Sequence, residues 1–264
     1  MALFFGLCYN GDRDPLPGVE VGEGPGPAGA WPPRQGRPGG RAKPATARSA
    51  ALRGPRLPAG TKTEEDAKMA KLYFKYGAMG SSKSAQALIT KFNYEELGMT
   101  VWLIKPSVDT RDGADIIKSR IGLAKKADII LPEDNIIEKF DQHPGMDVII
   151  ADECQFFTPE QIDQLRTLVD ERDMPVICFG LRTDFLTHLF PGSRRLFEVA
   201  DSLTEIKTVC ACGHKATVNA RIAGGRIVTE GEQVFLGGNE SYVAMCYKCW
   251  QEKIKKQREE DNNR

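Results

Sequence analysis

Between residues 70 and 200, short apolar runs alternate with longer segments in which apolar positions recur every three or four residues. The short runs are rich in β-branched and aromatic residues and predict strands, which cover residues 71–76, 101–104, 128–131, 148–151 and 176–179. The longer segments predict helices over residues 84–97, 114–124 and 159–171. Strands that alternate with helices in this order predict an α/β domain, with helices on both faces of a parallel sheet.

The predicted helix over residues 159–171 has the clearest start signal. Thr158 is a suitable N-cap, Pro159 suits the first helical position, and Gln161 stands three residues beyond the cap. Its apolar residues fall on one face, as in a helix that lies on a sheet; they are Ile162, Leu165, Leu168 and Val169. We expect this face to form core and to have no other role.

The first sixty residues differ in composition from the rest, because they hold 10 of the 16 prolines and 12 of the 26 glycines. A segment with so few apolar clusters cannot bury enough surface to offset the entropy that folding removes. We therefore expect residues 1–68 to be a disordered extension outside the working protein, which would begin at Met69. The charged residues 251–264 are expected to form a flexible tail.

The charges balance, with 36 basic and 36 acidic side chains, so the chain as a whole gives no reason to expect a nucleic-acid partner. Nothing in the sequence resembles a secretory signal or a transmembrane span, because the apolar opening Leu3-Phe4-Phe5 lacks a basic flank and a long apolar core. We therefore expect a cytoplasmic protein with no membrane partner.

A Gly/Ser-rich stretch joins the first predicted strand to the first predicted helix. It reads Gly77-Ala78-Met79-Gly80-Ser81-Ser82-Lys83-Ser84. Such a loop turns backbone N–H groups toward an anion at a helix N-terminus. Lys83 adds a cation for the outer phosphates, and the Ser84 hydroxyl suits Mg²⁺. The stretch predicts a nucleoside triphosphate site, and the alternative is an ordinary turn before a helix. Ser82 stands where the usual pattern has glycine, and a positive φ there would be strained.

A second feature strengthens the first, because the apolar run 148–151 ends in Asp152 and Glu153. This pattern predicts a buried parallel strand with two acids at its carboxyl edge, which is where α/β sheets place their ligands. Asp152 is the candidate for the metal side, and Glu153 is the candidate general base. The alternative is a strand followed by a solvated Asp-Glu turn, which the phosphate loop upstream makes less favourable.

Two close cysteine pairs form the third feature. Cys210 and Cys212 precede a Gly-rich segment with hairpin-like strands over residues 217–222, 226–229 and 233–236, and Cys246 and Cys249 follow it. Four thiolates in two pairs fit a closed, tetrahedral structural zinc site. A disulfide framework is the rival, which a reducing compartment disfavours. Three other cysteines lie outside the pairs and are best interpreted as small apolar or unpaired residues, namely Cys8, Cys154 and Cys178.

Over residues 69–250 the chain resembles the type II (cellular, zinc-containing) thymidine kinases. Besides the phosphate loop, the strings that carry the resemblance are Lys105-Pro106, Thr110-Arg111, Asp152-Glu153-Cys154-Gln155-Phe156-Phe157, Gly180-Leu181-Arg182-Thr183-Asp184-Phe185 and Gly237-Gly238-Asn239-Glu240 with Tyr242-Val243. The resemblance implies a P-loop (RecA-like) parallel sheet over residues 69–207 and a small zinc-ribbon or lasso domain over residues 208–250. It also implies phosphoryl transfer from ATP to the 5′-hydroxyl of thymidine, a homotetramer, and feedback inhibition by thymidine triphosphate.

Carried over by residue, the resemblance implies that residues 77–84 hold the ATP phosphates, with Lys83 and Arg111 close to the transferring group. Asp152, Glu153, Cys154 and Gln155 would complete the nucleotide and Mg²⁺ side, with Glu153 as the proton acceptor. A loop within residues 219–241 would close over the base. The residues around the nucleoside would be Met79, Phe156, Leu181, Phe185, Asn219, Gly237, Gly238 and Tyr242, and Asn219 stands where relatives often carry a small hydroxyl residue.

Two other functions remain open. A phosphate loop with a zinc ribbon also describes ATPases that act on DNA, and a zinc ribbon alone could be a binding module without chemistry. The first predicts ATP hydrolysis stimulated by DNA, with a salt-dependent affinity. The second predicts no turnover. The position of Gly237, Gly238 and Tyr242 just before the last cysteine pair favours a nucleoside lid over both.

Overall fold

The structure is a computed structural model, and it describes residues 69–108, 113, 115–234 and 241–263. The expectations for the extension 1–68 and for Arg111, Gly237 and Gly238 lie outside the described residues. Among the described residues, no helix is both long enough and apolar enough to cross a lipid bilayer.

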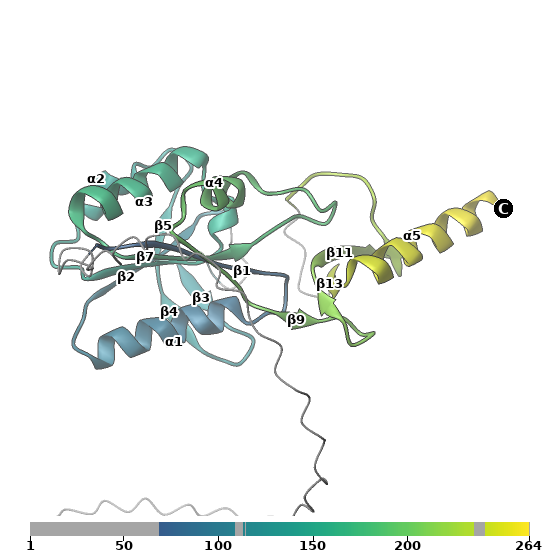
Figure 1. Ribbon diagram of the computed structural model, residues 1–264, viewed down its shortest axis with the longest axis horizontal. Coiled ribbons are helices and arrows are strands. Elements are labelled where there is room, and N and C mark those ends of the chain that lie inside the picture. The colour runs from purple at the N-terminus through teal and green to yellow at the C-terminus, as the bar shows by residue number, and fades with distance from the viewer. Residues whose placement is uncertain (1–68, 109–112, 114, 235–240, 264) are drawn as a thin grey trace, which may run out of the picture. The chain divides into compact units, whose positions relative to one another are not determined.

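Six parallel strands form the central sheet, in the order β5-β2-β6-β7-β1-β8. Their bounds are β1 Leu72–Gly77, β2 Val101–Pro106, β5 Asp128–Ile130, β6 Val148–Ala151, β7 Val176–Leu181 and β8 Ser202–Glu205. The first five match the predicted strands. The parallel sheet with helices confirms the predicted α/β fold class (Figure 1).

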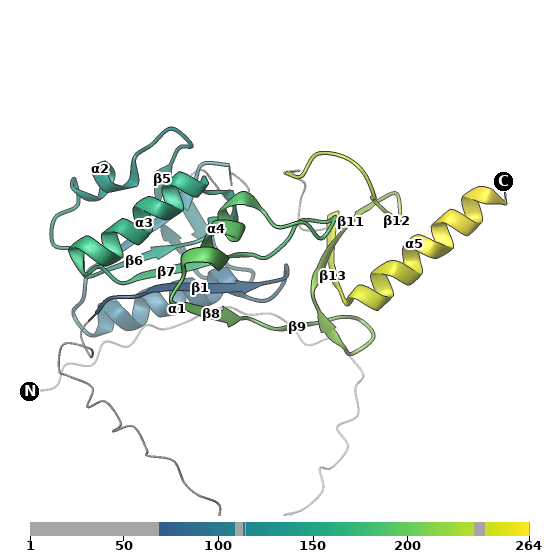
Figure 2. The same ribbon diagram turned by 45° about the horizontal axis from the view of Figure 1, so that its top comes forward.

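Helices cover both faces of this sheet (Figures 1 and 2). Helix α1 (Lys83–Glu96) lies on one face, and α2 (Ile136–Phe140), α3 (Pro159–Arg172) and α4 (Pro191–Val199) lie on the other. Successive residues of each strand point to opposite faces of the sheet, so alternate residues pack into the core on one face or the core on the other. In β6, for example, Val148 and Ile150 pack toward α1, whereas Ile149 and Ala151 pack toward α3. The predicted capping box of Thr158 and Gln161 is confirmed.

The helix predicted over residues 114–124 is wrong. The described residues there form an antiparallel hairpin of β3 (Ile116–Lys118) and β4 (Ala124–Lys126). Gly122 makes the turn with φ +90°, a conformation that side chains disfavour. Ile117 is buried in the core beneath the sheet, whereas Ile121 is 67% exposed. The apolar residues therefore do not share one helical face.

A second, smaller core surrounds the two cysteine pairs. Strands β9 (Thr208–Val209) and β10 (Lys215–Ala216) form one hairpin, and β12 (Arg226–Ile227), β11 (Val218–Ala223) and β13 (Tyr242–Met245) form a three-stranded sheet. The strands predicted over residues 217–222 and 226–229 correspond to β11 and β12. Gln233 and Val234, at the start of the strand predicted over residues 233–236, lie outside the strands.

The flexible tail expected over residues 251–264 is also a wrong prediction, because helix α5 extends over Tyr247–Asn262. Trp250 and Ile254 bury one side of α5 in the second core. One turn further on, Gln257 accepts a hydrogen bond from Ile227 N at 2.6 Å and donates one to Ile227 O at 3.1 Å. These contacts attach α5 to the second core, although its charged sequence alone predicts a solvent-exposed segment.

Candidate active site

The phosphate loop lies between the carboxyl end of β1 and the start of α1, as predicted. Close packing enforces its shape, since a Cβ on Gly77 would lie 2.4 Å from Ile206 O and 2.6 Å from Ser81 Oγ. Gly80 has φ +73° and Ser82 has φ 63°. Ser82 therefore adopts the left-handed conformation that glycine favours, and it carries a strain that the usual sequence pattern avoids.

Lys83 is buried at the start of α1 and folds back over the loop. Its Nζ donates to Ala78 O at 2.9 Å and to Ser81 Oγ at 3.4 Å. The ammonium therefore lies within the loop, where backbone N–H groups and the N-terminal end of α1 also favour an anion.

Asp152 and Glu153 follow β6 at the same edge of the sheet. Asp152 is only 2% exposed. Burial, together with the charge of Glu153, raises the pKa of Asp152 to about 7, while a hydrogen bond from the Ser84 hydroxyl and the charge of Lys83 oppose that rise. A buried carboxylate beside a second acid favours a cation, which would lower its pKa again. Oxygen ligands from Ser84 and Asp152 suit Mg²⁺.

Glu153 is held in an unusual backbone conformation, with φ 50°. Its side chain accepts a hydrogen bond from Gln155 Nε2 at 2.6 Å. Gln155 is itself fixed, because its Oε1 accepts from Leu181 N at 2.9 Å. Residues other than glycine rarely adopt a positive φ unless the surrounding structure imposes it, and such strain is concentrated at functional sites.

Two cavities meet at Glu153. The first, of about 360 Å³, is lined by the phosphate loop, Asp152, Lys105 and the β3–β4 hairpin with Arg120. The second is lined mainly by apolar and aromatic residues, with three amides, a threonine and an aspartate; they are Met79, Gln155, Phe156, Leu181, Thr183, Asp184, Phe185, Phe190, Asn219, Gln233, Val234 and Tyr242. Glu153, Met79 and Leu181 line both. A polar, cationic cavity therefore adjoins an apolar one, with a carboxylate between them.

The walls of the second cavity are braced by Arg221 of β11. Its guanidinium carbon lies 3.8 Å from the centre of the Phe185 ring, and its Nε donates to Tyr242 Oη at 3.0 Å. Its Nη2 donates to Glu232 O at 3.0 Å. Phe156 packs edge-on against Phe190, with ring centres 5.6 Å apart. Flat apolar walls with fixed polar edges suit an aromatic base.

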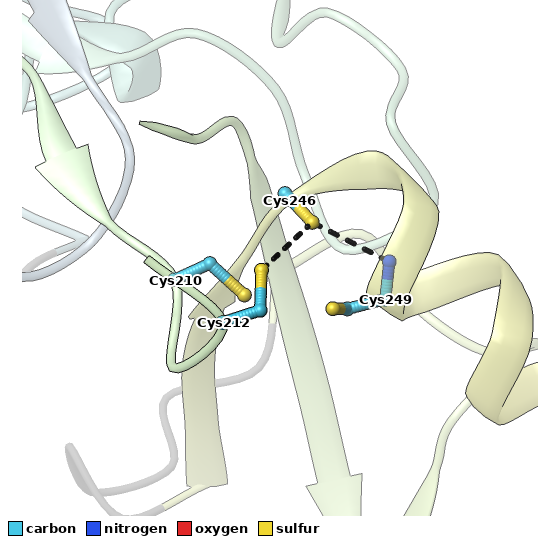
Figure 3. Close-up of side chains that lie close together, drawn as sticks. All are labelled: Cys210, Cys212, Cys246 and Cys249. Atoms are coloured by element: carbon cyan, nitrogen blue, oxygen red, sulfur yellow. Dashed lines mark hydrogen bonds between the residues drawn. The ribbon is translucent and has the colours of Figure 1, made fainter. Parts of the chain in front are cut away.

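The four predicted cysteines come together in the second core. The sulfur atoms of Cys210, Cys212, Cys246 and Cys249 all lie within 4.8 Å of one another and point toward a shared centre (Figure 3). The Cys212 and Cys246 sulfurs are 3.6 Å apart. A tetrahedral zinc site with Zn–S bonds of about 2.3 Å needs sulfurs about 3.8 Å apart, so the cluster fits this ion.

Two thiols of this cluster differ in how readily they lose their protons. Hydrogen bonds from the backbone N–H groups of Cys212 and Cys246 lower the pKa of Cys210 to about 6. Cys249 retains its proton, because its hydrogen bonds to the neighbouring cysteine sulfurs, above all Cys212 and Cys246, raise its pKa to about 12. Zinc binding would release that proton. His214, whose Nδ1 lies 3.4 Å from the Cys212 sulfur, borders the cluster.

Comparisons with known proteins identify the family of this chain. The family model for thymidine kinase matches residues 70–250. The chain belongs to the thymidine kinase family. It is 45% identical to the thymidine kinase of Ruegeria pomeroyi over an alignment of 188 residues. This alignment covers 70% of this chain and 95% of the relative. It is 44% identical to the thymidine kinase of Enterobacteria phage T4 over an alignment of 192 residues. This alignment covers 71% of this chain and 99% of the relative.

Among solved structures, the Pif1 helicase of Candida albicans aligns with a TM-score of 0.32 and 15% identity, over 54% of this chain and 37% of that chain. This likeness is too low to bear on function. The family assignment makes the chain an enzyme and favours kinase chemistry over a DNA-dependent ATPase or a binding module.

The structure brings most of the expected site residues to the two cavities. Among those described, Gly77, Ala78, Ser81 and Cys154 line neither cavity. Cys154 is fully buried, and its Sγ donates to Ala151 O at 3.1 Å, so it lies in the core beneath the site. Gln155 lines the second cavity and holds Glu153, instead of lining the phosphate cavity.

No role was expected from the sequence for two basic residues that line the first cavity, although Lys105 belongs to one of the strings that carry the resemblance. Lys105 is 1% exposed at the end of β2, and its Nζ donates to Ile116 O of the hairpin at 3.1 Å. Arg120, in the hairpin turn, lines the cavity and reaches the phosphate loop, where its Nη1 lies 3.8 Å from the Cβ position of Gly80. A lysine inside an otherwise apolar strand was a usable signal, whereas Arg120 was hidden by the wrong helix prediction.

Replacing Ser82 with glycine should stabilise the kinase, because glycine adopts the left-handed conformation at little cost. We expect Ser82→Gly to raise the free energy of unfolding by about 1 kcal/mol, as measured by urea denaturation. Ser81→Gly, next to it, is the control and should not stabilise. Equal stability of Ser82→Gly and the native chain would contradict the strain.

Removing one cysteine of the cluster should remove the metal. We expect the native kinase to carry one zinc ion per chain by elemental analysis, and Cys246→Ser to carry none and to melt at a lower temperature. Cys178→Ala is the matched control, since Cys178 is buried in the sheet core and should leave the zinc content unchanged. A zinc-loaded Cys246→Ser protein would exclude Cys246 as a ligand.

Proposed function

We propose that this chain transfers the γ-phosphate of ATP to the 5′-hydroxyl of thymidine, giving thymidine monophosphate and ADP. One observation carries the proposal beyond the family assignment, namely that Glu153 lies where the phosphate cavity meets the apolar cavity. A donor phosphate in the first cavity and a nucleoside in the second would bring the transferring group and its acceptor to this carboxylate.

The phosphate loop supplies the donor side. Backbone N–H groups of residues 77–84 and the Lys83 ammonium would hold the triphosphate. Ser84 and Asp152 would hold Mg²⁺, which neutralises charge on the phosphates when bound. Arg120 and Lys105 also line this cavity and add positive charge to it. Arg111 remains part of the proposal, on the resemblance alone.

Glu153 would accept the proton of the 5′-hydroxyl as the new bond to phosphorus forms. An alcohol is a weak nucleophile, and a positioned carboxylate assists it, although alignment and charge neutralisation account for most of the catalysis. Gln155, which binds Glu153 and Leu181 N, keeps this carboxylate at the junction. The base would lie among Phe156, Phe185 and Tyr242.

The remaining assignments are also proposals. The cysteine cluster would hold a structural zinc ion, since four thiolates leave no open position for chemistry. The resemblance supports a homotetramer inhibited by thymidine triphosphate. Free thiols and zinc thiolates favour a reducing compartment, which supports the cytoplasm. Residues 69–207 and 208–250 would be the two domains, with Gly237 and Gly238 in the lid.

The proposed reaction is tested by incubating the protein with Mg²⁺, ATP and each of the four natural deoxynucleosides, and separating the nucleotides formed. We expect a monophosphate from thymidine and little from the other three. ADP without any monophosphate, increased by added DNA, would instead favour an ATPase that acts on DNA.

Substitution of the proposed base should separate catalysis from binding. We expect Glu153→Gln to lower kcat by about 10²–10⁴-fold, because an amide cannot accept the proton, while the affinity for ATP is retained. Glu160→Gln, at the exposed start of α3, is the control and should keep native turnover. A native kcat in Glu153→Gln would remove Glu153 from the mechanism.

The hairpin arginine should matter for phosphate transfer. Loss of one charged hydrogen bond costs about 1.5–3 kcal/mol, so we expect Arg120→Ala to lower kcat/KM for ATP by about 10–150-fold. Lys125→Ala, in the exposed strand β4 of the same hairpin, controls for general loss of positive charge. Equal effects of the two substitutions would indicate that Arg120 acts only through long-range charge.

A further inference from the structure

Strand β11 presents two buried polar side chains, Asn219 and Arg221, on one face, since residues two apart in a strand point the same way. Arg221 braces the second cavity. Asn219 is 2% exposed and lines that cavity, so a simple expectation is that its amide contacts the base.

Both ends of the Asn219 amide are engaged by backbone groups. Its Oδ1 accepts from Met79 N of the phosphate loop at 2.7 Å, and its Nδ2 donates to Thr183 O at 2.7 Å. The reverse orientation of the amide would set its NH₂ against a backbone N–H and its oxygen against a carbonyl. The two partners therefore fix the orientation, and they favour a bridging role over reading the base.

The two backbone groups belong to different parts of the site. Met79 lies in the phosphate loop, whereas Thr183 lies in the loop after β7 that lines the second cavity. The loop after β7 is itself well braced. Asp184 Oδ1 accepts from Leu186 N and His188 N, both at 2.9 Å, and its Oδ2 accepts from Gln233 Nε2 at 2.8 Å. A planar amide thus joins the phosphate loop to a rigid wall of the apolar cavity.

We propose that Asn219 is a positioning residue that couples the two substrate sites, so that a nucleoside in one cavity strengthens triphosphate binding in the other. The inference rests on the proposed function, because it takes the two cavities as the two substrate sites. A ligand that shifts the position of either backbone segment shifts the other through the amide, and the second ligand then binds a site already in place. Such coupling is reciprocal.

The test compares binding with and without the second substrate. The affinity of an imido analogue of ATP, which is not hydrolysed, is measured calorimetrically with Mg²⁺, in the presence and absence of saturating thymidine. In the native protein we expect thymidine to tighten analogue binding by about fivefold or more. In Asn219→Leu, which keeps the branched shape at Cγ but neither hydrogen bond, the ratio should fall to about 1. Asn219→Ala, which cannot overpack, serves if the leucine variant does not fold.

Gln257→Leu is the matched control. Gln257 also bridges two backbone groups, Ile227 N and Ile227 O, but it lies on α5 and lines neither cavity. It should retain the native ratio. A variant of Asn219 with the native ratio would overturn the proposal, and so would a native protein without coupling. A direct contact with the base would change thymidine affinity equally with and without the analogue.

Failure of this inference and failure of the proposed function are distinguishable. A native protein that forms thymidine monophosphate but shows no coupling contradicts only the role of Asn219. A native protein that forms no monophosphate contradicts the function itself, whatever the binding ratio.

Discussion

The site depends on the parallel pairing of β1, β7 and β6. Parallel strands end at a common edge, and the registers Gly77 with Leu181 and Ala151 with Cys178 fix how the following loops meet. The phosphate loop, the two acids and the loop with Thr183 are thereby brought together from positions up to 106 residues apart, as between Gly77 and Thr183. Close packing at Gly77 leaves the phosphate loop little freedom to leave that edge.

Electrostatics then determines what this edge can hold. Asp152 is buried beside another acid, and its raised pKa reflects this burial and the charge of Glu153. Lys83, Lys105 and Arg120 surround the same cavity. Two acids on one side and three basic groups around them suit a metal-bound polyphosphate better than a neutral ligand. The apolar cavity beyond Glu153 has the opposite character, and under the proposed function this contrast would separate the two substrates.

Local features of the site could be predicted from the sequence. The phosphate loop and the cysteine pairs each depend on short spacings, so residue order alone was sufficient. The hairpin at residues 116–126 could not be predicted, because its isoleucines suit a helix as well as a strand, and burial of Ile117 and the turn at Gly122 decide between them. Helix α5 was missed because Trp250 and Ile254 are its sole buried residues, and two buried positions are too few to mark a helical face in the sequence.

The bridge made by Asn219 left no trace in the sequence. It joins residues 140 and 36 positions apart, and an isolated asparagine in a strand has no spacing that marks it. Strand pairing and packing between the two cores bring these residues together. Ser82 is different, because the departure from glycine was visible in the sequence, but its positive φ required coordinates.

The stereochemical course at phosphorus tests the central claim most directly. ATP made chiral at its γ-phosphorus with oxygen isotopes is converted with thymidine, and the configuration of the product phosphate is determined. Direct transfer between two adjacent cavities, with Glu153 accepting the proton, predicts inversion, because the attacking and leaving oxygens lie in line. Retention would require a phosphorylated enzyme intermediate and would contradict the account.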